Sequence, residues 1–442
     1  MLRTFTAGNY RNVKMGGSGY PKFGPINLLV GPNNAGKSNF IRAMSFMPEM
    51  LLGDTSPTAF LHTLEEHGRA EMVNWANDGE FRKSHGVDVM LSWLMDDPLS
   101  KPRAEKQGSA PPEESLDLVY HLGIRVGDSG SFPSGFYIGN ESIFKARSQD
   151  GQQPTVQWEG AKLLVIRQPP QLDQVSFLAP AQENMITIAV ETNETILKQT
   201  KSFLKNEAFY KNFFPDFDKV SESLQIFAKG FHSYSSTELN LRLMAEAVKI
   251  DVGVRTLDPE GRQFVNVLRY LDQKYDFLDE YTERLQELLP DLKKVKIVDA
   301  SDTHKRLDLS VGRHRYHLPE MSDGTLRALW LALILFSPER GSVLALDEPE
   351  LNLHPAWLKV VGGWLQRFRS AEQIFVSTHS PELLDTFTEG FQKGEVTLFV
   401  FDRGDKGMHE VAAAELTEFF KEGWQLGDLY RVGEPKLGGW PW

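Results

Sequence analysis

Cysteine is absent from the 442 residues of this sequence. The absence excludes disulfide bridges and thiolate metal sites, and it agrees with a reducing compartment, so we expect a cytoplasmic protein. Long apolar runs are also missing, because the longest one, residues 328–336, is far shorter than the roughly 20 residues that span a bilayer. Residues 1–17 contain no apolar signal core. We therefore expect no membrane partner.

Positive charge is scarce relative to negative charge. The sequence has 48 lysine and arginine residues against 60 aspartate and glutamate residues, which gives a formal net charge of −12. Such a chain repels phosphate overall, so it could bind nucleic acid only through a local basic patch. Its length allows one large domain with insertions, or two to three modules.

The two ends of the chain alternate apolar strands with amphipathic helices. This alternation predicts a parallel α/β sheet. The expected strands are 2–6, 26–30, 342–346, 373–377 and 396–401, with helices at 326–336 and 356–368.

The middle of the chain differs. Strands are expected at 86–95, 116–126, 135–147 and 162–167, and residues 192–292 are expected to be mostly helical. We expect an α/β domain with a mixed sheet, interrupted by a strand-rich and a helical insertion. The predicted parts are 1–50 and 301–442 for the discontinuous domain, 51–185 for the strand-rich insertion and 186–300 for the helical one.

A phosphate-binding pattern, G-x-x-x-x-G-K-[ST], occupies residues 31–38, between an expected strand and an expected helix. Backbone N–H groups at a helix N-terminus bind anions, and glycines let the backbone curl around a phosphate. Lys37 would reach the β- and γ-phosphates of ATP, and the Ser38 hydroxyl would bind Mg²⁺. The expected nucleotide contacts in this loop are Gly31, Asn33, Asn34, Ala35, Gly36, Lys37, Ser38 and Asn39.

Three further side chains follow expected strands at the end where the phosphate loop begins. Asp347 is predicted to hold Mg²⁺, and Glu348 to polarise the attacking water. His379 follows the next strand and would contact the γ-phosphate or hold that water. Alone, the acid pair is more typical of a solvated strand end, and a lone histidine is usually structural. The phosphate loop favours the catalytic interpretation, with Lys37, Glu348 and His379 as the catalytic candidates.

The segment Ser322-Asp323-Gly324-Thr325 precedes the helix expected at 326–336. Ser322 is a good N-cap, because a serine side chain accepts hydrogen bonds from the first free amides of a helix. The Ser322 hydroxyl and the Gly324 amide could also face a phosphate at the positive end of the helix. The two interpretations are compatible.

The order of these motifs resembles the ABC-type P-loop ATPase heads of the RecF, SMC and overcoming-lysogenization-defect families. The sequence is most similar to prokaryotic AAA-type ATPases of that clade, which are found beside phage-defence effectors. The resemblance covers the start of the chain and nearly everything from residue 257 onward, including the segment 426–430. Asp323 and Thr325 stand where many ABC proteins have Gly and Gln.

The resemblance implies a head-to-head dimer with two ATP molecules between the heads, each contacted by Ser322 and Gly324 of the partner subunit. Asn352 and His354 would line the dimer seam. A glutamine would also contact Mg²⁺, with Gln182 as the first candidate and Gln168 as the second. The implied function is an ATP-hydrolysing switch that senses or clamps a target and regulates a separate effector, such as a nuclease or toxin, in antiviral defence. Higher oligomers stay open.

Two other functions stay open. A RecF-like ATPase would bind DNA directly. Lys198, Lys201 and Lys205, on one expected helical face, could serve it together with the nearby Lys211 and Lys219, although a solvated lysine face is the more common explanation of such a pattern. A low-turnover scaffold would bind ATP mainly for its shape.

Overall fold

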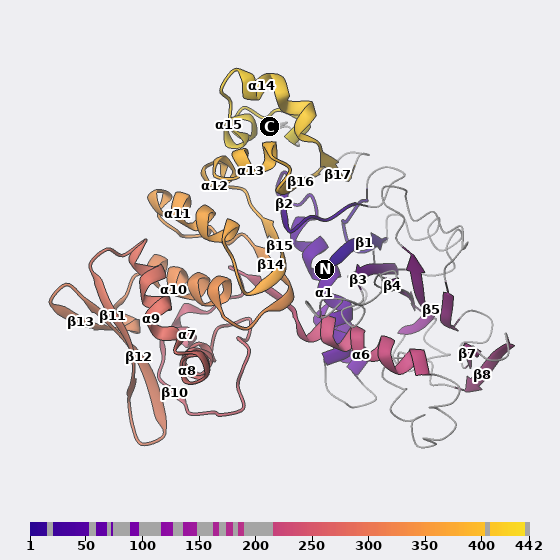
Figure 1. Cartoon of the computed structure of the whole chain (residues 1–442), viewed down its shortest axis with the longest axis horizontal. Helices are drawn as coiled ribbons and strands as arrows, with labels where there is room; N and C mark the ends of the chain where they lie inside the picture. The colour runs from indigo at the N-terminus through magenta and orange to yellow at the C-terminus, as the bar shows by residue number, and fades with distance from the viewer. Residues whose placement is uncertain are drawn as a thin grey trace, which may run out of the picture. The chain divides into compact units, whose positions relative to one another are not determined.

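The computed structural model describes residues 1–15, 21–52, 59–68, 72–73, 89–96, 116–126, 136–147, 162–167, 174–179, 184–189, 215–402 and 407–437. The chain divides into two compact units (Figure 1). The first comprises Met1–Gly24, Pro32–Phe231 and Val400–Glu410, and the second comprises Pro25–Gly31, His232–Phe399 and Val411–Trp442. The four-part division expected from the sequence stays a prediction.

The first unit contains an antiparallel sheet in which strands adjacent in the chain are mostly neighbours. Its order is β1 (Leu2–Gly8), β3 (Val89–Asp96), β4 (Leu116–Val126), β5 (Phe136–Arg147), β6 (Lys162–Arg167), β7 (Gln174–Ala179) and β8 (Asn184–Ala189). The helices of this unit among the described residues are α1 (Lys37–Leu52), α2 (Ala59–Glu66) and α6 (Pro215–Lys229).

Aromatic side chains join α1 to this sheet. The ring of Phe5 lies 5.4 Å from that of Phe40 and 5.3 Å from that of Trp93, measured between centroids. The indole N–H of Trp93 donates to the Met44 carbonyl at 3.1 Å. Phe5, Phe40 and Trp93 are all fully buried. Large apolar rings therefore hold the helix that follows the phosphate loop.

The second unit is built on a sheet whose central strands β2 (Ile26–Val30), β15 (Ala371–Ser377) and β14 (Gly341–Asp347) are parallel. Its strands are ordered β16 (Val396–Phe401), β2, β15, β14 and β9 (Phe231–Ser235). The pairs β2–β15 and β15–β14 are parallel, and every residue of β2 is buried. Continuous apolar strands of this kind are typical of a parallel sheet covered on both faces.

Short helices and connections complete this unit. The helices are α10 (Asp323–Phe336), α11 (Pro355–Gln366), α12 (Pro381–Asp385), α13 (Thr388–Gln392), α14 (Thr417–Lys421) and α15 (Leu426–Arg431). Single 3₁₀ turns lie at Leu318–Glu320, Ala413–Leu416 and Pro435–Leu437. Strand β17 (Met408–Val411) follows β16 in the chain, and its residues Met408–Glu410 belong to the first unit.

A smaller antiparallel sheet also belongs to the second unit. It consists of β10 (Val248–Lys249), β12 (His304–Val311) and β11 (Leu292–Asp299), with β13 (His314–His317) paired to β12. The nearby helices are α7 (Leu241–Ala245), α8 (Phe264–Tyr275) and α9 (Phe277–Gln286). The Tyr281 hydroxyl of α9 donates to the Leu329 carbonyl of α10 at 2.7 Å.

The expected elements agree well with the described ones, with one notable difference. Strands 26–30, 116–126, 162–167 and 396–401 have the predicted bounds. The described part of 192–292 does contain helices α6 to α9, but it also contains strands β9 and β10. β9 is only five residues long and three of them are polar, so it lacks the apolar run that marks the other strands of its sheet.

Two adjacent glycines of α11 offer a matched test of how closely this helix packs against Thr386. A Cβ at Gly362 would lie 2.1 Å from Oγ1 and 2.6 Å from Cβ of Thr386, whereas a Cβ at Gly363 would meet only Arg367 Nη2 at 3.6 Å. We expect Gly362→Ala to lower the free energy of unfolding by about 1–3 kcal/mol because of overpacking. Gly363→Ala should raise it by up to about 1 kcal/mol through helix propensity. Urea denaturation measures both, and equal effects would contradict the described contact.

Candidate functional site

Parallel strand pairing brings the carboxyl ends of three strands to one edge of the second unit's main sheet. Asp347 at the end of β14 pairs with Ser377 at the end of β15, and Ser377 pairs with Leu29 of β2. Gly31, the first residue of the phosphate loop, lies two positions beyond Leu29. Ligands of open parallel sheets bind at this edge.

Hydrogen bonds fix the position of Asp347. The Ser377 hydroxyl donates to Asp347 Oδ1 in a short hydrogen bond, and Ser235 Oγ lies 3.5 Å from Oδ2. The residue that follows β9 contributes as well, because Ser236 N donates to the Asp347 carbonyl at 3.1 Å. The sequence interpretation did not select Ser235 or Ser377, although Ser377 is visible as the polar residue that ends its strand.

Glu348 adopts a left-handed backbone conformation, with φ of 51°. Its N–H donates to the Ser377 carbonyl at 3.1 Å and to Ser377 Oγ at 3.2 Å. Such a conformation is uncommon for a residue with a side chain, and it is found often at functional sites. It ends the strand abruptly, so that Glu348 Oε1 comes within 3.5 Å of His379 Nε2. The structure thus brings these two predicted catalytic residues together.

A carboxylate that the sequence interpretation missed holds the segment before His379. Glu350 Oε1 accepts hydrogen bonds from Thr378 Oγ1 at 2.6 Å and from the His379 N–H at 2.9 Å. Its other oxygen, Oε2, is buried without a hydrogen bond to the described residues. Burial raises the pKa of Glu350, and the bonds from Thr378 and His379 offset this effect only in part. The position of Glu350, two residues after Glu348, was the feature of the sequence that could have indicated this role.

Tyr430 connects His379 to the start of the phosphate loop. Its hydroxyl lies 3.2 Å from His379 Nδ1 and 3.3 Å from the Gly31 carbonyl oxygen, to which it donates. Burial, followed by the charges of Glu350 and Glu348, raises the pKa of Tyr430 to about 12, so this hydroxyl stays protonated at neutral pH. The Gly31 carbonyl can only accept, so the tyrosine hydroxyl can donate to it while it accepts from a protonated Nδ1 of His379. Nε2 is the nitrogen that faces Glu348.

The rest of the phosphate loop belongs to the first unit and is tightly curled. Lys37 is buried, and its Nζ donates to the Pro32 carbonyl at 3.0 Å. Asn34 and Gly36 have positive φ values of 61° and 104°. The side chains of Asn33, Asn34 and Ser38 are exposed. This backbone fits a phosphate site, since consecutive amides of a curled loop converge on an anion.

The loop after β1 braces the phosphate loop. Asn12 Nδ2 donates to the Asn34 carbonyl at 2.7 Å, and Asn39 Nδ2 donates to Asn12 Oδ1 at 2.6 Å. Arg11 Nη1 donates to Asn39 Oδ1 at 3.2 Å. A Cβ at Gly36 would lie only 3.2 Å from the Asn12 carbonyl oxygen. Glycine at position 36 is therefore required by a close backbone approach as well as by its φ angle.

Ser322 caps helix α10, as one of the two sequence interpretations predicted. Its hydroxyl accepts from Thr325 N at 3.3 Å and lies 2.9 Å from Thr325 Oγ1. A Cβ at Gly324 would lie 3.4 Å from the Asn352 carbonyl oxygen, so the helix N-terminus lies beside the loop that precedes α11. Binding of a phosphate by Ser322 and Gly324 stays a prediction.

The predicted metal ligands are only partly described. Gln182 and Gln168 lie outside the described residues, as do Lys198, Lys201, Lys205 and Lys211. Within the described ranges, no group of three or more His, Asp or Glu residues could hold a metal ion. The side-chain oxygens of Ser38, in the first unit, and of Asp347, in the second, are of the kind that Mg²⁺ prefers, and binding of the ion by these two residues stays a prediction.

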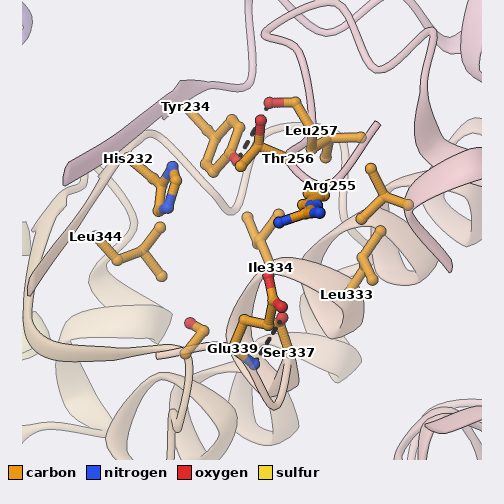
Figure 2. A pocket seen from close by; sticks show the side chains of 12 residues that line it. His232, Tyr234, Arg255, Thr256, Leu257, Leu333, Ile334, Ser337, Glu339 and Leu344 are labelled. Carbon is orange, nitrogen blue, oxygen red and sulfur yellow. Dashed lines mark hydrogen bonds between the residues drawn. The ribbon is translucent and has the colours of Figure 1, made fainter. Parts of the chain in front are cut away.

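A pocket lies at the other end of the same strands (Figure 2). Leu344 of β14 and Ser370, directly before β15, line it, together with His232 and Glu339. Burial lowers the pKa of His232, and the charge of Glu339 opposes this effect. The residues that line this pocket include none of the predicted nucleotide contacts. The pocket is therefore separate from the candidate site.

Comparison with known proteins agrees with the P-loop interpretation. The family model described as "AAA domain, putative AbiEii toxin, Type IV TA system" matches residues 236–385. This stretch of the chain is therefore similar to an AAA domain. A search of curated proteins gave no match. Among the residues that the structure describes, no helix is long and apolar enough to cross a membrane.

Similar solved structures include heads of SMC proteins. An SMC head bound to the C-terminal winged-helix domain of ScpA has a TM-score of 0.44 and 11% identity, with 94% of this chain and 99% of that chain covered. The SMC head domain from Thermotoga maritima has a TM-score of 0.34 and 12% identity, with 93% and 98% covered. The SMC head with an extended coiled coil, bound to the C-terminal domain of ScpA from Pyrococcus furiosus, gives 0.37 and 11%, with 95% and 98% covered. Likenesses this weak say nothing about what this chain binds.

We expect Glu350→Gln to change how stability depends on pH. Because burial raises the folded-state pKa of Glu350, its carboxyl stabilises the fold below the unfolded-state pKa, and this contribution is lost as the pH rises through the folded-state pKa. The unfolding free energy of the wild type should therefore fall relative to that of Glu350→Gln as the pH rises over this window. Urea denaturation at a series of pH values measures the difference.

Glu382→Gln is the control for this measurement. The backbone amide of Glu382, opposed by burial and helped by Arg431, lowers the pKa of the Glu382 carboxyl. Its contribution is present above the unfolded-state pKa and is lost as the pH falls, so the trend should have the opposite sign. The same trend for both variants would contradict the role of burial at Glu350.

Proposed function

We propose that the chain binds ATP with Mg²⁺, hydrolyses it, and acts as a dimeric switch that controls a separate effector. The observation that carries the proposal is the sheet edge at which Gly31, Asp347 and Ser377 meet. The match of residues 236–385 to an AAA family supports the ATP-binding part. Dimerisation and effector control are implied by the resemblance of the motifs to ABC-type heads.

The phosphate loop supplies binding. Its amides and Lys37 are proposed to hold the β- and γ-phosphates, because a curled loop before a helix concentrates positive partial charge. Ser38 and Asp347 are the proposed Mg²⁺ ligands. When bound, Mg²⁺ neutralises charge on the phosphate oxygens. The hydrogen bonds from Ser377 and Ser235 would hold the Asp347 carboxylate in one orientation.

Glu348 and His379 are proposed to act on the attacking water. Glu348 is partly exposed and would accept a hydrogen bond from this water, which orients it and increases its nucleophilicity. His379 would orient the water or contact the γ-phosphate through Nε2. Tyr430 and Glu350 are positioning residues in this proposal, because they hold the ring and the backbone of His379.

An exposed surface is available for the second subunit. Ser322, Asn352 and His354 are exposed, and Gly324 contacts the Asn352 backbone. The N-terminus of α10 carries the positive end of a 14-residue helix dipole, which suits the nucleotide held by a partner subunit. In this arrangement ATP closes the dimer and hydrolysis reopens it.

The regulated partner is proposed to be a nuclease or toxin in antiviral defence. This part comes from the motif resemblance, and the matched family carries a toxin description of its own. Gln182 is still proposed as the further Mg²⁺ contact. A low-turnover scaffold remains the alternative that a turnover measurement separates from the switch.

Substitutions of Lys37 and Glu348 test the proposal. Lys37→Ala should abolish ATP binding, because it removes the cation of the loop. Glu348→Gln should retain binding but lower phosphate release about 100-fold or more, because the acceptor for the water proton is weakened. It should also accumulate an ATP-bound dimer. Phosphate release, nucleotide binding and light scattering with ATP measure these outcomes.

Glu389→Gln is the matched control, because Glu389 is a glutamate with 80% exposure on α13 that pairs with Lys393. It should behave as the wild type. Equal phosphate release from the wild type, Lys37→Ala and Glu348→Gln would show that the chain does not hydrolyse ATP at this site. Binding without turnover in the wild type would favour the scaffold, and a monomer in every sample would refute the dimeric switch.

A further inference from the structure

The small antiparallel sheet of the second unit gathers basic side chains on one face. Residues paired directly across an antiparallel sheet lie on the same face, as do alternate residues along each strand. The register pairs Lys294 with Ser310 and Ser310 with Arg315, and it pairs Lys249 with His304. The members of this face that carry a full positive charge are Lys249, Lys294, Lys296, Arg306 and Arg315. We call them the basic face.

The opposite face of this sheet is covered, so the basic face points outward. Val295, Leu307 and Leu309 lie on the opposite face and are at most 1% exposed. The sheet contacts helices α8 and α9, and Val295 N donates to Thr282 Oγ1 of α9 at 3.4 Å. Strands β11, β12 and β13 form the left edge of Figure 1, coloured orange. Lys249, Lys294, Lys296 and Arg315 are exposed, and Arg306 is partly exposed.

One buried carboxylate organises part of the basic face. Asp308 Oδ1 lies 2.7 Å from His317 Nδ1 and 3.1 Å from Arg306 Nε, and Oδ2 lies 2.6 Å from Arg315. Burial alone would raise the pKa of Asp308, but the His317 hydrogen bond and the two arginines hold it below the ordinary value. Asp308 therefore carries one negative charge and fixes the two arginines. Five cations and one anion leave a clear positive excess.

This excess is notable in a chain with a net charge of −12. Acidic residues also occur near the sheet. Asp291, Asp302 and Glu320 lie outside the paired rows, and Asp299 of β11 lies on the opposite face, where it pairs with Lys305. A local basic surface is what an acidic protein needs in order to hold a polyanion. Alternate cations along a strand stand about 7 Å apart, and a nucleic-acid duplex presents roughly one charge per 1.7 Å of its axis. Each cation can therefore meet a phosphate.

The side chains of the face favour a duplex over other polyanions. Protein interfaces are enriched in aromatic residues and depleted of lysine, whereas Val298 is the single apolar residue in the paired rows of this face. Single-stranded nucleic acid is held by aromatic rings that stack on its bases, and the described face has no Phe, Tyr or Trp. Lysine and arginine without stacking partners are typical of contacts with duplex phosphates.

We propose that the basic face of the β10–β13 sheet binds the phosphate backbone of double-stranded nucleic acid without regard to sequence. The register of the strands β10 to β13 carries this proposal. It does not rest on ATP hydrolysis, and it concerns different residues from the lysines around position 200.

Fluorescence anisotropy with a labelled DNA duplex at several salt concentrations tests the proposal on the full chain. Affinity of the wild type should fall steeply with salt, because phosphate contacts release counterions. The double variant Lys294→Gln/Lys296→Gln should bind roughly tenfold or more weakly at physiological salt, and its slope of log K against log salt should be smaller by about 2. Lys37→Ala should bind the duplex as the wild type does.

The control removes the same charge elsewhere in the second unit. Lys359 and Lys393 are exposed lysines on α11 and at the end of α13, so Lys359→Gln/Lys393→Gln should leave duplex binding unchanged. Circular dichroism and urea denaturation establish that both double variants are folded. The proposal is overturned if the wild type fails to bind the duplex at low salt, or if both double variants lose affinity equally. Binding of polyglutamate without binding of the duplex would assign the face to an acidic protein instead.

Discussion

The parallel pairing of β2, β15 and β14 is the constraint on which the candidate site depends. It places residues that are more than 300 positions apart in the chain at a single edge. Leu29 of β2 pairs with Ser377 of β15, and Ser377 pairs with Asp347 of β14. The apolar side chains of these strands are buried, so the register is strongly specified by the core. A shift of one residue would turn Asp347 away from the edge. Hydrophobic packing of these strands therefore sets the geometry of the proposed site.

A second layer of hydrogen bonds refines this placement. Ser377 bonds to both acids at the end of β14. Its hydroxyl donates to Asp347, the last residue of the strand, and its carbonyl accepts from the N–H of Glu348, the next residue. Glu350 holds the backbone of His379, and Tyr430 holds its ring. Each predicted catalytic side chain of the second unit is thus supported by a neighbour whose own position is fixed. Such support keeps reacting groups in place and is a common requirement of catalytic sites.

Much of the fold could be predicted from the sequence because its signals are local. The loop 31–38 and the strands that end at Val30 and Asp347 are recognisable from a few adjacent residues. Ser235, Glu350 and Tyr430 could not be assigned in this way, since each acts through a partner that only the tertiary structure brings near. β9 was missed because its polar residues hide its periodicity. The basic face was missed for another reason: its members come from separate strands, and strand register is not readable from composition.

The contact between Tyr430 and Gly31 spans 399 positions of the chain. During synthesis the N-terminal residues leave the ribosome first, and chain elongation proceeds at roughly 5–20 residues per second. Gly31 is therefore synthesised tens of seconds before Tyr430, whose hydroxyl bonds to its carbonyl. His379 is also synthesised before this hydroxyl group. The phosphate loop can acquire its full set of supports only after α15 has emerged. This site is therefore completed late in the synthesis of the chain.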